Sequence, residues 1–339
     1  MFGLIIVSLF ATVVHPLTHH LAVGTIDGQA LYSLETDDVA RRVYMIQARD
    51  AAGASSSLAL DVCAHVLFGL TSDGFTTLRS KEIVGDVHSL AWSPTGRNLH
   101  ALNSRSSASS TTSITNFRIA EDPNLEDIAG TDILANVTSA SQIVSHPTSD
   151  LVYLVTKDTN ELVTLPLQQM NMRLRHRATA SPSRYRLLPS SLDATQFHTS
   201  SLAITSSKNT LWTLSQSQNQ AVITAFSLNA TTGEVLNVAA RASWQGAGEG
   251  QLTAAPFAAG EVVAITNSPM GYITVLGLEQ NLAGFASEFG QSSEHDYLKA
   301  MPVTGLKRDG MDAAAARIQS YGRAILDDFI GLGESVWID

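Results

Sequence analysis

The stretch His88-Ser-Leu-Ala-Trp-Ser-Pro-Thr-Gly-Arg-Asn-Leu-His-Ala-Leu102 decides the fold, because the chain repeats it. It reads as a short apolar strand, a polar turn containing Pro94, and a second apolar strand. Ser141-Gln-Ile-Val-Ser-His-Pro-Thr-Ser-Asp-Leu-Val-Tyr-Leu-Val155 repeats the unit nearly position for position, with Pro147 in register. Further copies begin at Ser56, Ser200 and Leu252. Internal repetition of such a unit indicates an array of small, similar sheets.

Each unit is a meander that cannot bury both faces alone, so the copies must pack face to face around an axis. The sequence therefore predicts an all-β protein, a β-propeller, in which six first strands can be counted. The end of the chain, Glu334-Ser-Val-Trp-Ile-Asp339, resembles a first strand, whereas His19-His-Leu-Ala-Val-Gly-Thr25 resembles a second. We therefore expect the last blade to be closed by strands from the two termini, which would remove open edges.

One segment does not follow the repeat. Ile318, Tyr321, Ile325 and Phe329 are spaced so that they would share one face of a helix. We therefore predict one short amphipathic helix within an insertion spanning residues 285–330, lying over a channel mouth or rim. The remainder, residues 17–339, is expected to form a single propeller domain that includes this insertion.

The first 16 residues are expected to be a secretion signal. The apolar run within Met1–Val14 has the length of a signal-peptide hydrophobic region and is too short to span a bilayer. This predicts an extracellular or cell-wall protein, with a cytoplasmic protein as the alternative in which the run is a buried strand. In a secreted chain the sequons at Asn136 and Asn229 would carry glycans on exposed turns.

The net charge, the single cysteine and the missing motifs argue against several classes of function and of binding site. The formal net charge of −10 disfavours binding to nucleic acid or to anionic membrane surfaces. Cys63 is the single cysteine, so no intramolecular disulfide can form, and its apolar neighbours indicate a buried small side chain. No phosphate-binding glycine loop, nucleophile elbow or zinc spacing is present, and we expect no cofactor and no metal.

Several stretches resemble the fungal 3-carboxy-cis,cis-muconate lactonizing enzymes, or carboxymuconate cyclases, of the lactonase-like seven-bladed propeller superfamily. The resemblance rests on Leu17–Thr25, Val87–Pro94, Ser145–Thr148 and Gly331–Asp339. It implies seven blades and an isomerase that closes a lactone by intramolecular addition of a carboxylate. Secreted fungal wall and surface glycoproteins are also similar to this family. Bacterial 6-phosphogluconolactonases belong to the same superfamily.

Chemistry in a propeller is expected where the innermost strands begin, because these residues point into the central channel. The positions that the repeats place there are Ser56, His88, Ser141, Ser200, Leu252 and Glu334. His88 is the expected proton carrier, with Glu334 as its candidate partner. His146 and His198 are expected to hydrogen-bond blade turns.

The family resemblance implies a histidine, two arginines and a glutamate in the site, and His88 alone is retained. Ser141 stands where the first arginine is expected, Lys157 in place of the glutamate, and Gln216 in place of the second arginine. We consider Ser141, Ser200 and Gln216 candidate substrate contacts. The segment containing Arg173, Arg175, Arg177, Arg184 and Arg186 could supply the missing cations, Arg175 and Arg177 above all, or could be a solvated basic loop.

Three functions remain open. The first is a diverged carboxymuconate cyclase-like enzyme that binds a small carboxylate or lactone in the channel. The second is a catalytically inactive secreted or cell-wall glycoprotein with a binding or structural role. The third is a lactone hydrolase, in which water attacks the lactone; the fold does not decide among them.

Overall fold

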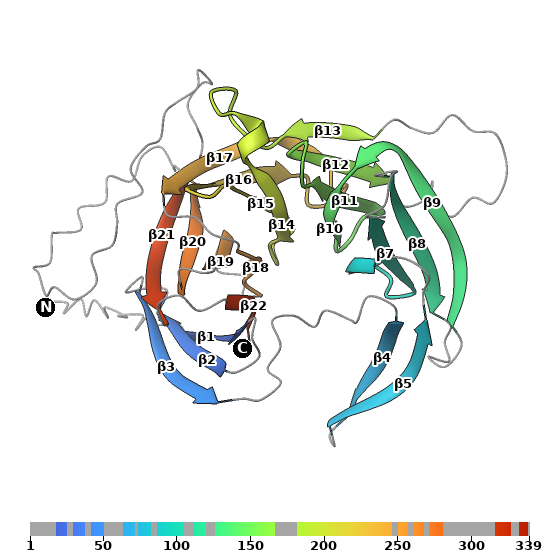
Figure 1. The fold of residues 1–339 in the computed structure, drawn as a ribbon, viewed down its shortest axis with the longest axis horizontal. Helices are drawn as coiled ribbons and strands as arrows, with labels where there is room; N and C mark the ends of the chain where they lie inside the picture. Colours follow the sequence, from blue (N-terminus) through green and yellow to red (C-terminus); the bar gives the residue numbers. More distant parts are fainter. Residues whose placement is uncertain are drawn as a thin grey trace, which may run out of the picture.

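The computed structural model describes residues 18–25, 30–37, 42–50, 64–71, 74–82, 87–104, 111–119, 126–166, 182–245, 250–256, 261–267, 271–280, 316–326 and 332–337. These residues form six antiparallel sheets, five of them four-stranded. The sheets are arranged around a common centre, with β10, β14, β18 and β22 innermost (Figure 1). The predicted all-β propeller is confirmed.

The strands follow one another from the centre outwards within each blade. The blades are β6 (Val87–Trp92), β7 (Asn98–Ser104), β8 (Thr111–Ile119) and β9 (Glu126–Thr138); β10 (Ala140–Ser145), β11 (Leu151–Thr156), β12 (Glu161–Pro166) and β13 (Ser183–Arg186); β14 (His198–Ile204), β15 (Thr210–Gln216), β16 (Gln220–Leu228) and β17 (Val235–Gln245); and β18 (Leu252–Ala254), β19 (Glu261–Asn267), β20 (Tyr272–Gln280) and β21 (Ala316–Ile325). A short 3₁₀ turn, η2 (Ala194–Gln196), precedes β14. The two remaining sheets are the two-stranded pair β4 (Ala64–Thr71) and β5 (Gly74–Glu82), and the terminal blade described next.

The terminal blade has the predicted closure. Its order is β22 (Leu332–Trp337), β1 (Thr18–Thr25), β2 (Ala30–Asp37) and β3 (Arg42–Asp50). β22 pairs antiparallel with β1, placing Leu21 opposite Trp337 and Val23 opposite Ser335. The last strand of the chain is therefore the first strand of the blade that the N-terminal strands complete.

The apolar core is divided among the seams between successive blades. One cluster joins Leu102 and Ile114 to Ile143 and Leu154 of the next blade. Equivalent clusters fill the seams between the β10–β13 and β14–β17 blades, between β14–β17 and β18–β21, and between β18–β21 and the terminal blade. The second strands β11 and β15 are covered on both faces, because every residue of β15 and all but the first residue of β11 are buried. Such a strand reads as a continuous apolar run, as Leu151–Val155 does.

The predicted helix is wrong. Residues 316–325 form β21, the fourth strand of its blade, which pairs along its length with β20. The register shifts between Val275 and Leu276, so Tyr321 is an extra residue in β21. Gly322 follows with φ 153°, and a Cβ there would lie 3.0 Å from the Val43 nitrogen. A bulge in a strand disturbs the two-residue alternation, which is why the apolar spacing imitated a helix.

The side chains of this segment confirm that it packs as a strand. Ile318 is buried in the seam with the β14–β17 blade, and Tyr321 packs against the seam with the terminal blade. Ile325 is 55% exposed, so it does not share a buried face with Ile318. Phe329 lies outside the described residues. Among the described residues, the structure has no helix long and apolar enough to cross a membrane.

Candidate functional site

The innermost strands share an irregularity at the predicted channel positions. In β6 the pairing steps from Val87 to Ser89 against consecutive residues of β7, leaving His88 as an extra residue. The same shift leaves Ser141 extra in β10 and Ser200 extra in β14. A bulge re-aims side chains and interrupts pairing, and bulges are frequent beside active sites. The repeat thus places three predicted site residues at one structural feature.

β22 carries a comparable shift. Val23 pairs with Ser335 and Thr25 with Leu332, so Gly333 and Glu334 both lie opposite Gly24. Glu334 is therefore at the irregular start of an innermost strand, as His88 is in β6. The two titratable candidates occupy equivalent backbone positions in two blades.

In the β18–β21 blade the equivalent residue is Gly250, and the expected position of Leu252 is corrected. The turn after each innermost strand begins with a backbone hydrogen bond five residues after the bulge, from Ser93, His146 and Thr205. Ala255 makes this bond in the β18–β21 blade, which places Gly250 at the channel position. Leu252 is buried in the apolar seam against the β14–β17 blade.

The position of Gly250 could have been read from the prolines. Pro94 and Pro147 each follow the bulged residue by six positions, and Pro256 follows Gly250 by the same interval. Glycine is required at residue 250, because a Cβ there would lie 2.2 Å from the carbonyl oxygen of Thr266. This blade thus presents no side chain at the channel position.

The hydroxyl groups of Ser141 and Ser200 contact neighbouring strands. Ser141 Oγ donates to the carbonyl oxygens of Thr199, at 2.7 Å, and Val155, at 3.2 Å. Ser200 Oγ lies 3.4 Å from the carbonyl oxygen of Gly250. Both serines, predicted as substrate contacts, therefore hydrogen-bond across blade boundaries. They help to hold consecutive innermost strands together.

The residue after each bulge forms a second contact of this kind, which the sequence reading missed. Ser89 Oγ accepts from the Ile143 nitrogen, at 3.1 Å, and Ser201 Oγ accepts from the Leu252 nitrogen, at 3.0 Å. Gln142 Oε1 accepts from the Leu202 nitrogen in the same way. The available signal was the recurrence of serine or glutamine in the second position of each unit.

Gln216 ends β15 and is 7% exposed. Its Oε1 accepts from the Gly250 nitrogen, at 3.0 Å, and lies 3.4 Å from Ser200 Oγ. Its Nε2 is buried and has no hydrogen-bond partner. The amide thus holds the backbone of Gly250, and the substrate contact predicted for Gln216 stays a prediction.

The described arginines of the basic segment lie away from the innermost strands. Arg184 and Arg186 belong to β13, the outermost strand of its blade, and both are exposed. Arg184 Nη1 contacts Glu161 Oε2 at 2.6 Å, and the Arg186 carbonyl accepts from Arg241 Nη2 at 2.9 Å. The contact of Arg184 links β13 to β12, and the contact of Arg186 links β13 to β17 of the next blade.

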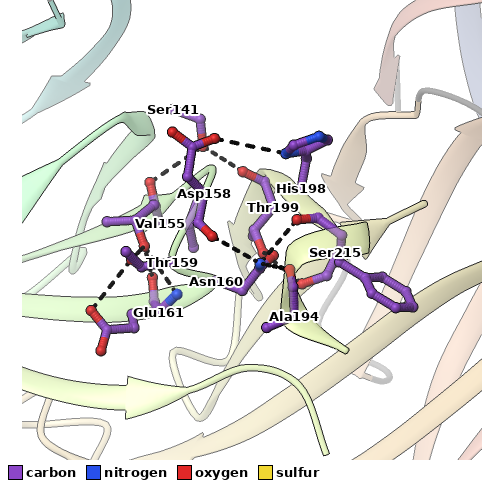
Figure 2. A network of polar contacts seen from close by, with 12 residues as sticks. Ser141, Val155, Asp158, Thr159, Asn160, Glu161, Ala194, His198, Thr199 and Ser215 are labelled. Atoms are coloured by element: carbon purple, nitrogen blue, oxygen red, sulfur yellow. Dashed lines mark hydrogen bonds and ion pairs between the residues drawn. The ribbon is translucent and has the colours of Figure 1, made fainter. Parts of the chain in front are cut away.

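A buried polar network joins the β10–β13 and β14–β17 blades at the bulged end (Figure 2). Its centre is Asn160, which is 1% exposed and has φ 50°. Asn160 Nδ2 donates to the carbonyl oxygens of Phe197, at 2.9 Å, and Ala194, at 3.0 Å. Asn160 Oδ1 accepts from Thr199 Oγ1 at 2.8 Å, and this hydroxyl also contacts Ser215 Oγ. The network fixes the start of β14 relative to the β11–β12 turn.

His198 and His146 differ from each other in their contacts. His146 is fully buried, and its Nδ1 accepts from the backbone nitrogens of Ser149, at 3.1 Å, and Thr148, at 3.3 Å, as predicted for a turn histidine. His198 is exposed, and its Nδ1 lies 3.8 Å from Asp158 Oδ1 in the β11–β12 turn. That separation is an ion-pair distance rather than a hydrogen bond.

Three of the described histidines are buried, namely His19, His100 and His146. His100 Nδ1 lies 2.5 Å from Asn116 Oδ1, a pair that the sequence reading did not identify. Burial lowers the pKa of His100, and the hydrogen bond to Asn116 opposes this effect. Burial likewise lowers the pKa of His146, against a smaller opposing contribution from the Lys208 backbone. Both side chains are therefore suited to remaining neutral near pH 7.

The two sequons lie in different environments. Asn229 occupies the turn between β16 and β17, where its Oδ1 accepts from the nitrogens of Thr231 and Thr232. Asn136 lies within β9 rather than in a turn, next to the buried Val137. Of the two, Asn229 has the turn position expected for a glycan acceptor.

Several predicted features lie outside the described residues: the signal segment 1–16, Ser56, Cys63, Arg173, Arg175 and Arg177. Within the described part of the chain, no group of three or more His, Cys, Asp or Glu side chains could hold a metal ion.

The comparisons with known proteins show the fold. No protein-family model matches the chain, and no curated protein sequence matches it. A solved protein from Bacteroides uniformis, assigned as a 6-phosphogluconolactonase, is similar with a TM-score of 0.51 at 11% identity, covering 94% of this chain and 84% of its own. A protein from Lactobacillus plantarum has a TM-score of 0.52 at 11% identity, with coverage of 77% and 92%. At this level of identity, the similarity to these two proteins shows the fold alone.

Proposed function

We propose that this propeller performs lactone chemistry at the bulged end of its channel, with His88 and Glu334 as the proton-transferring groups. The observation that supports the proposal is the recurrent register shift, which brings a histidine and a glutamate to equivalent positions in two innermost strands. Imidazole and carboxylate groups are the usual general acids and bases. Similar solved propellers include a protein assigned as a 6-phosphogluconolactonase, which is consistent with this class of reaction.

Two lactone reactions fit such a pair. In hydrolysis, Glu334 takes a proton from water as the water oxygen bonds to the lactone carbonyl carbon, and His88 protonates the ring oxygen as its bond to that carbon breaks. In the cyclase reaction, a carboxylate oxygen of the substrate adds to one alkene carbon, and His88 delivers a proton to the other. The cyclase substrate carries three carboxylates and needs several cations.

The described channel positions favour a weakly charged substrate. Ser141, Ser200 and Gly250 carry no charge, and Gln216 stands in place of the second arginine. Arg184 and Arg186 lie on the outermost strand. We therefore propose hydrolysis of small lactones as the first activity and a carboxymuconate cyclase-like reaction as the finer alternative.

A second candidate function is a catalytically inactive secreted or wall-associated scaffold. The hydroxyls of Ser141 and Ser200 favour it, because both bond to the backbone of neighbouring strands. In this case surface recognition, with a glycan at Asn229, would carry the function. The activity assay below separates the two candidates.

The test measures acid release from δ-valerolactone and, separately, loss of the diene absorbance of 3-carboxy-cis,cis-muconate. We expect turnover that falls about 100-fold or more in His88→Gln and in Glu334→Gln, because each variant removes one proton-transferring group. His20→Gln is the matched control, since His20 pairs with Glu35 at 3.7 Å in the terminal blade and is outside the proposed pair. Folded wild-type protein without turnover on either substrate would support the scaffold instead.

A further inference from the structure

The rim between the β10–β13 and β14–β17 blades brings together three charged or titratable residues that the proposed reaction does not use. Lys157 and Asp158 lie in the β11–β12 turn, and His198 is the first residue of β14. All three are exposed, and the side chains of His198 and Asp158 are 57% and 60% accessible. In Figure 2, Asp158 and His198 lie beside Ser141, the bulged residue of β10. Lys157 precedes Asp158 in the turn, and His198 lies two residues before Ser200, the bulged residue of β14.

The backbone beneath these exposed side chains is held by buried groups. The Thr199 nitrogen donates to the Lys157 carbonyl at 3.2 Å, and the Lys157 nitrogen donates to the Ser139 carbonyl at 2.7 Å. Asn160 contacts the carbonyl oxygens of residues on both sides, Asp158 at 3.4 Å and Phe197 at 2.9 Å. The turn and the strand start therefore form one fixed frame, which positions His198 relative to Asp158.

The fold gains little from the side-chain pair itself. A contact at 3.8 Å between two exposed side chains contributes little to stability. The seam is already closed by the Asn160 network and the apolar cluster below it. Positioned polar groups on a rigid frame are, however, what a binding site requires. The exposed ends of Lys157 and His198 are accessible to a ligand.

From this arrangement we propose that Lys157, Asp158 and His198 form a binding site for a hydroxycarboxylate. In the neutral form of the ring, the Asp158 carboxylate, 3.8 Å from Nδ1 of His198, favours the tautomer with the proton on Nδ1, and Nε2 is then an acceptor. A ligand hydroxyl donates to Nε2, and the ligand carboxylate pairs with the Lys157 ammonium. The ligand class rests on the proposed lactone chemistry, because a hydroxycarboxylate is the open form of a lactone.

The experiment uses 5-hydroxyvalerate as the probe and the full chain with labelled histidines. We expect the probe to shift the NMR signals of the His198 ring and to leave those of His20 unchanged. By calorimetry, His198→Ala and Lys157→Ala should each weaken binding of 5-hydroxyvalerate about two- to fivefold, the effect of losing one exposed hydrogen bond or ion pair. Valerate, which lacks the hydroxyl, should respond to Lys157→Ala and not to His198→Ala.

His20→Gln is the matched control, because its carboxylate pair has a similar spacing without the Asn160 frame. Equal effects at His20 and His198, or no shift of the His198 signals, would overturn the site. If the wild type binds 5-hydroxyvalerate at His198 but turns over no lactone, the site stands and the proposed reaction fails. Turnover without a His198 response leaves the reaction standing and refutes the site.

Discussion

A single buried side chain, that of Asn160, holds the β11–β12 turn against the start of β14 at the bulged end of these blades. Its positive φ is tolerated by asparagine better than by most residues, and its amide serves three carbonyl groups and one hydroxyl. Sequence reading did not single it out, because an asparagine before a strand reads as ordinary turn material. Its role depends on residues 34 to 39 positions away, such as Ala194 and Thr199.

Removing this amide should destabilise the seam. We expect Asn160→Gly to lower the free energy of unfolding by about 2 to 4 kcal/mol, since several buried hydrogen bonds are lost while the positive φ remains accessible. Asn160→Ala should cost more, because alanine also resists that φ. Urea unfolding followed by tryptophan fluorescence measures both. The control is Lys208→Gly, because residue 208 also has a positive φ. This variant should change the free energy of unfolding by less than about 1 kcal/mol.

His100 should make stability depend on pH. Its folded-state pKa lies below the ordinary value of 6.5, chiefly because burial disfavours the charged ring. Below pH 6.5 the unfolded chain therefore binds a proton that the folded chain does not, and the free energy of unfolding falls as the pH is lowered. Above pH 6.5 both states are neutral, and this contribution is constant.

The measurement is urea unfolding of wild type and His100→Gln at pH 7.5 and at pH 5.5. We expect the wild type to lose more stability between the two values than the variant, which keeps a polar side chain at this position but cannot titrate. His198→Gln serves as the exposed comparison. Identical pH dependence in wild type and His100→Gln would contradict the assignment.

At the scale of strands, the sequence predicts the regular units and fails where a bulge intervenes. Pro94, Pro147 and the apolar runs around them predict β6, β7, β10 and β11, because a repeated pattern is read several times over. Tyr321 and Gly322 broke the alternation in β21, so a strand was interpreted as a helix. Residues 316–325 form a strand and not a helix because the backbone groups along the edge of β20 need hydrogen-bonding partners, which β21 supplies.

The same limit applies to the candidate site. The repeat predicted that His88, Ser141 and Ser200 begin innermost strands, and the C-terminal segment predicted the same for Glu334. The structure places all four at register shifts, which the sequence did not predict, and their chemical roles stay a prediction. Leu252 was misplaced by two residues, since an aliphatic residue follows the bulge at a fixed interval and resembles a strand start. The pairing of His198 with Asp158 crosses a blade boundary, and no local pattern encodes such a contact.

At the scale of the whole molecule, the apolar core is divided among the seams between neighbouring blades. We therefore expect the stability of the ring to depend on β22, which closes the terminal blade. The seam between the β18–β21 blade and the terminal blade contains Leu21, Val23, Val262 and Ile273. β22 is the innermost strand of that terminal blade and contacts β1 on one side. Without it, β1 would expose an unpaired edge, and the first strand of the blade would be missing from the channel.

Deleting residues 334–339 should therefore unfold the ring rather than trim a tail. The deletion removes the paired residues Ser335, Val336 and Trp337, which lie opposite Val23, Ala22 and Leu21. Because each blade is supported by its neighbours, we expect the loss to reach the near-ultraviolet circular dichroism of the entire chain and to abolish cooperative thermal unfolding. Ser335→Ala, which keeps the strand, is the control and should unfold cooperatively. A truncated chain that retains a sharp transition near the wild-type Tm would mean that the other seams hold the propeller without the terminal strand, and that closure protects an edge without maintaining the fold.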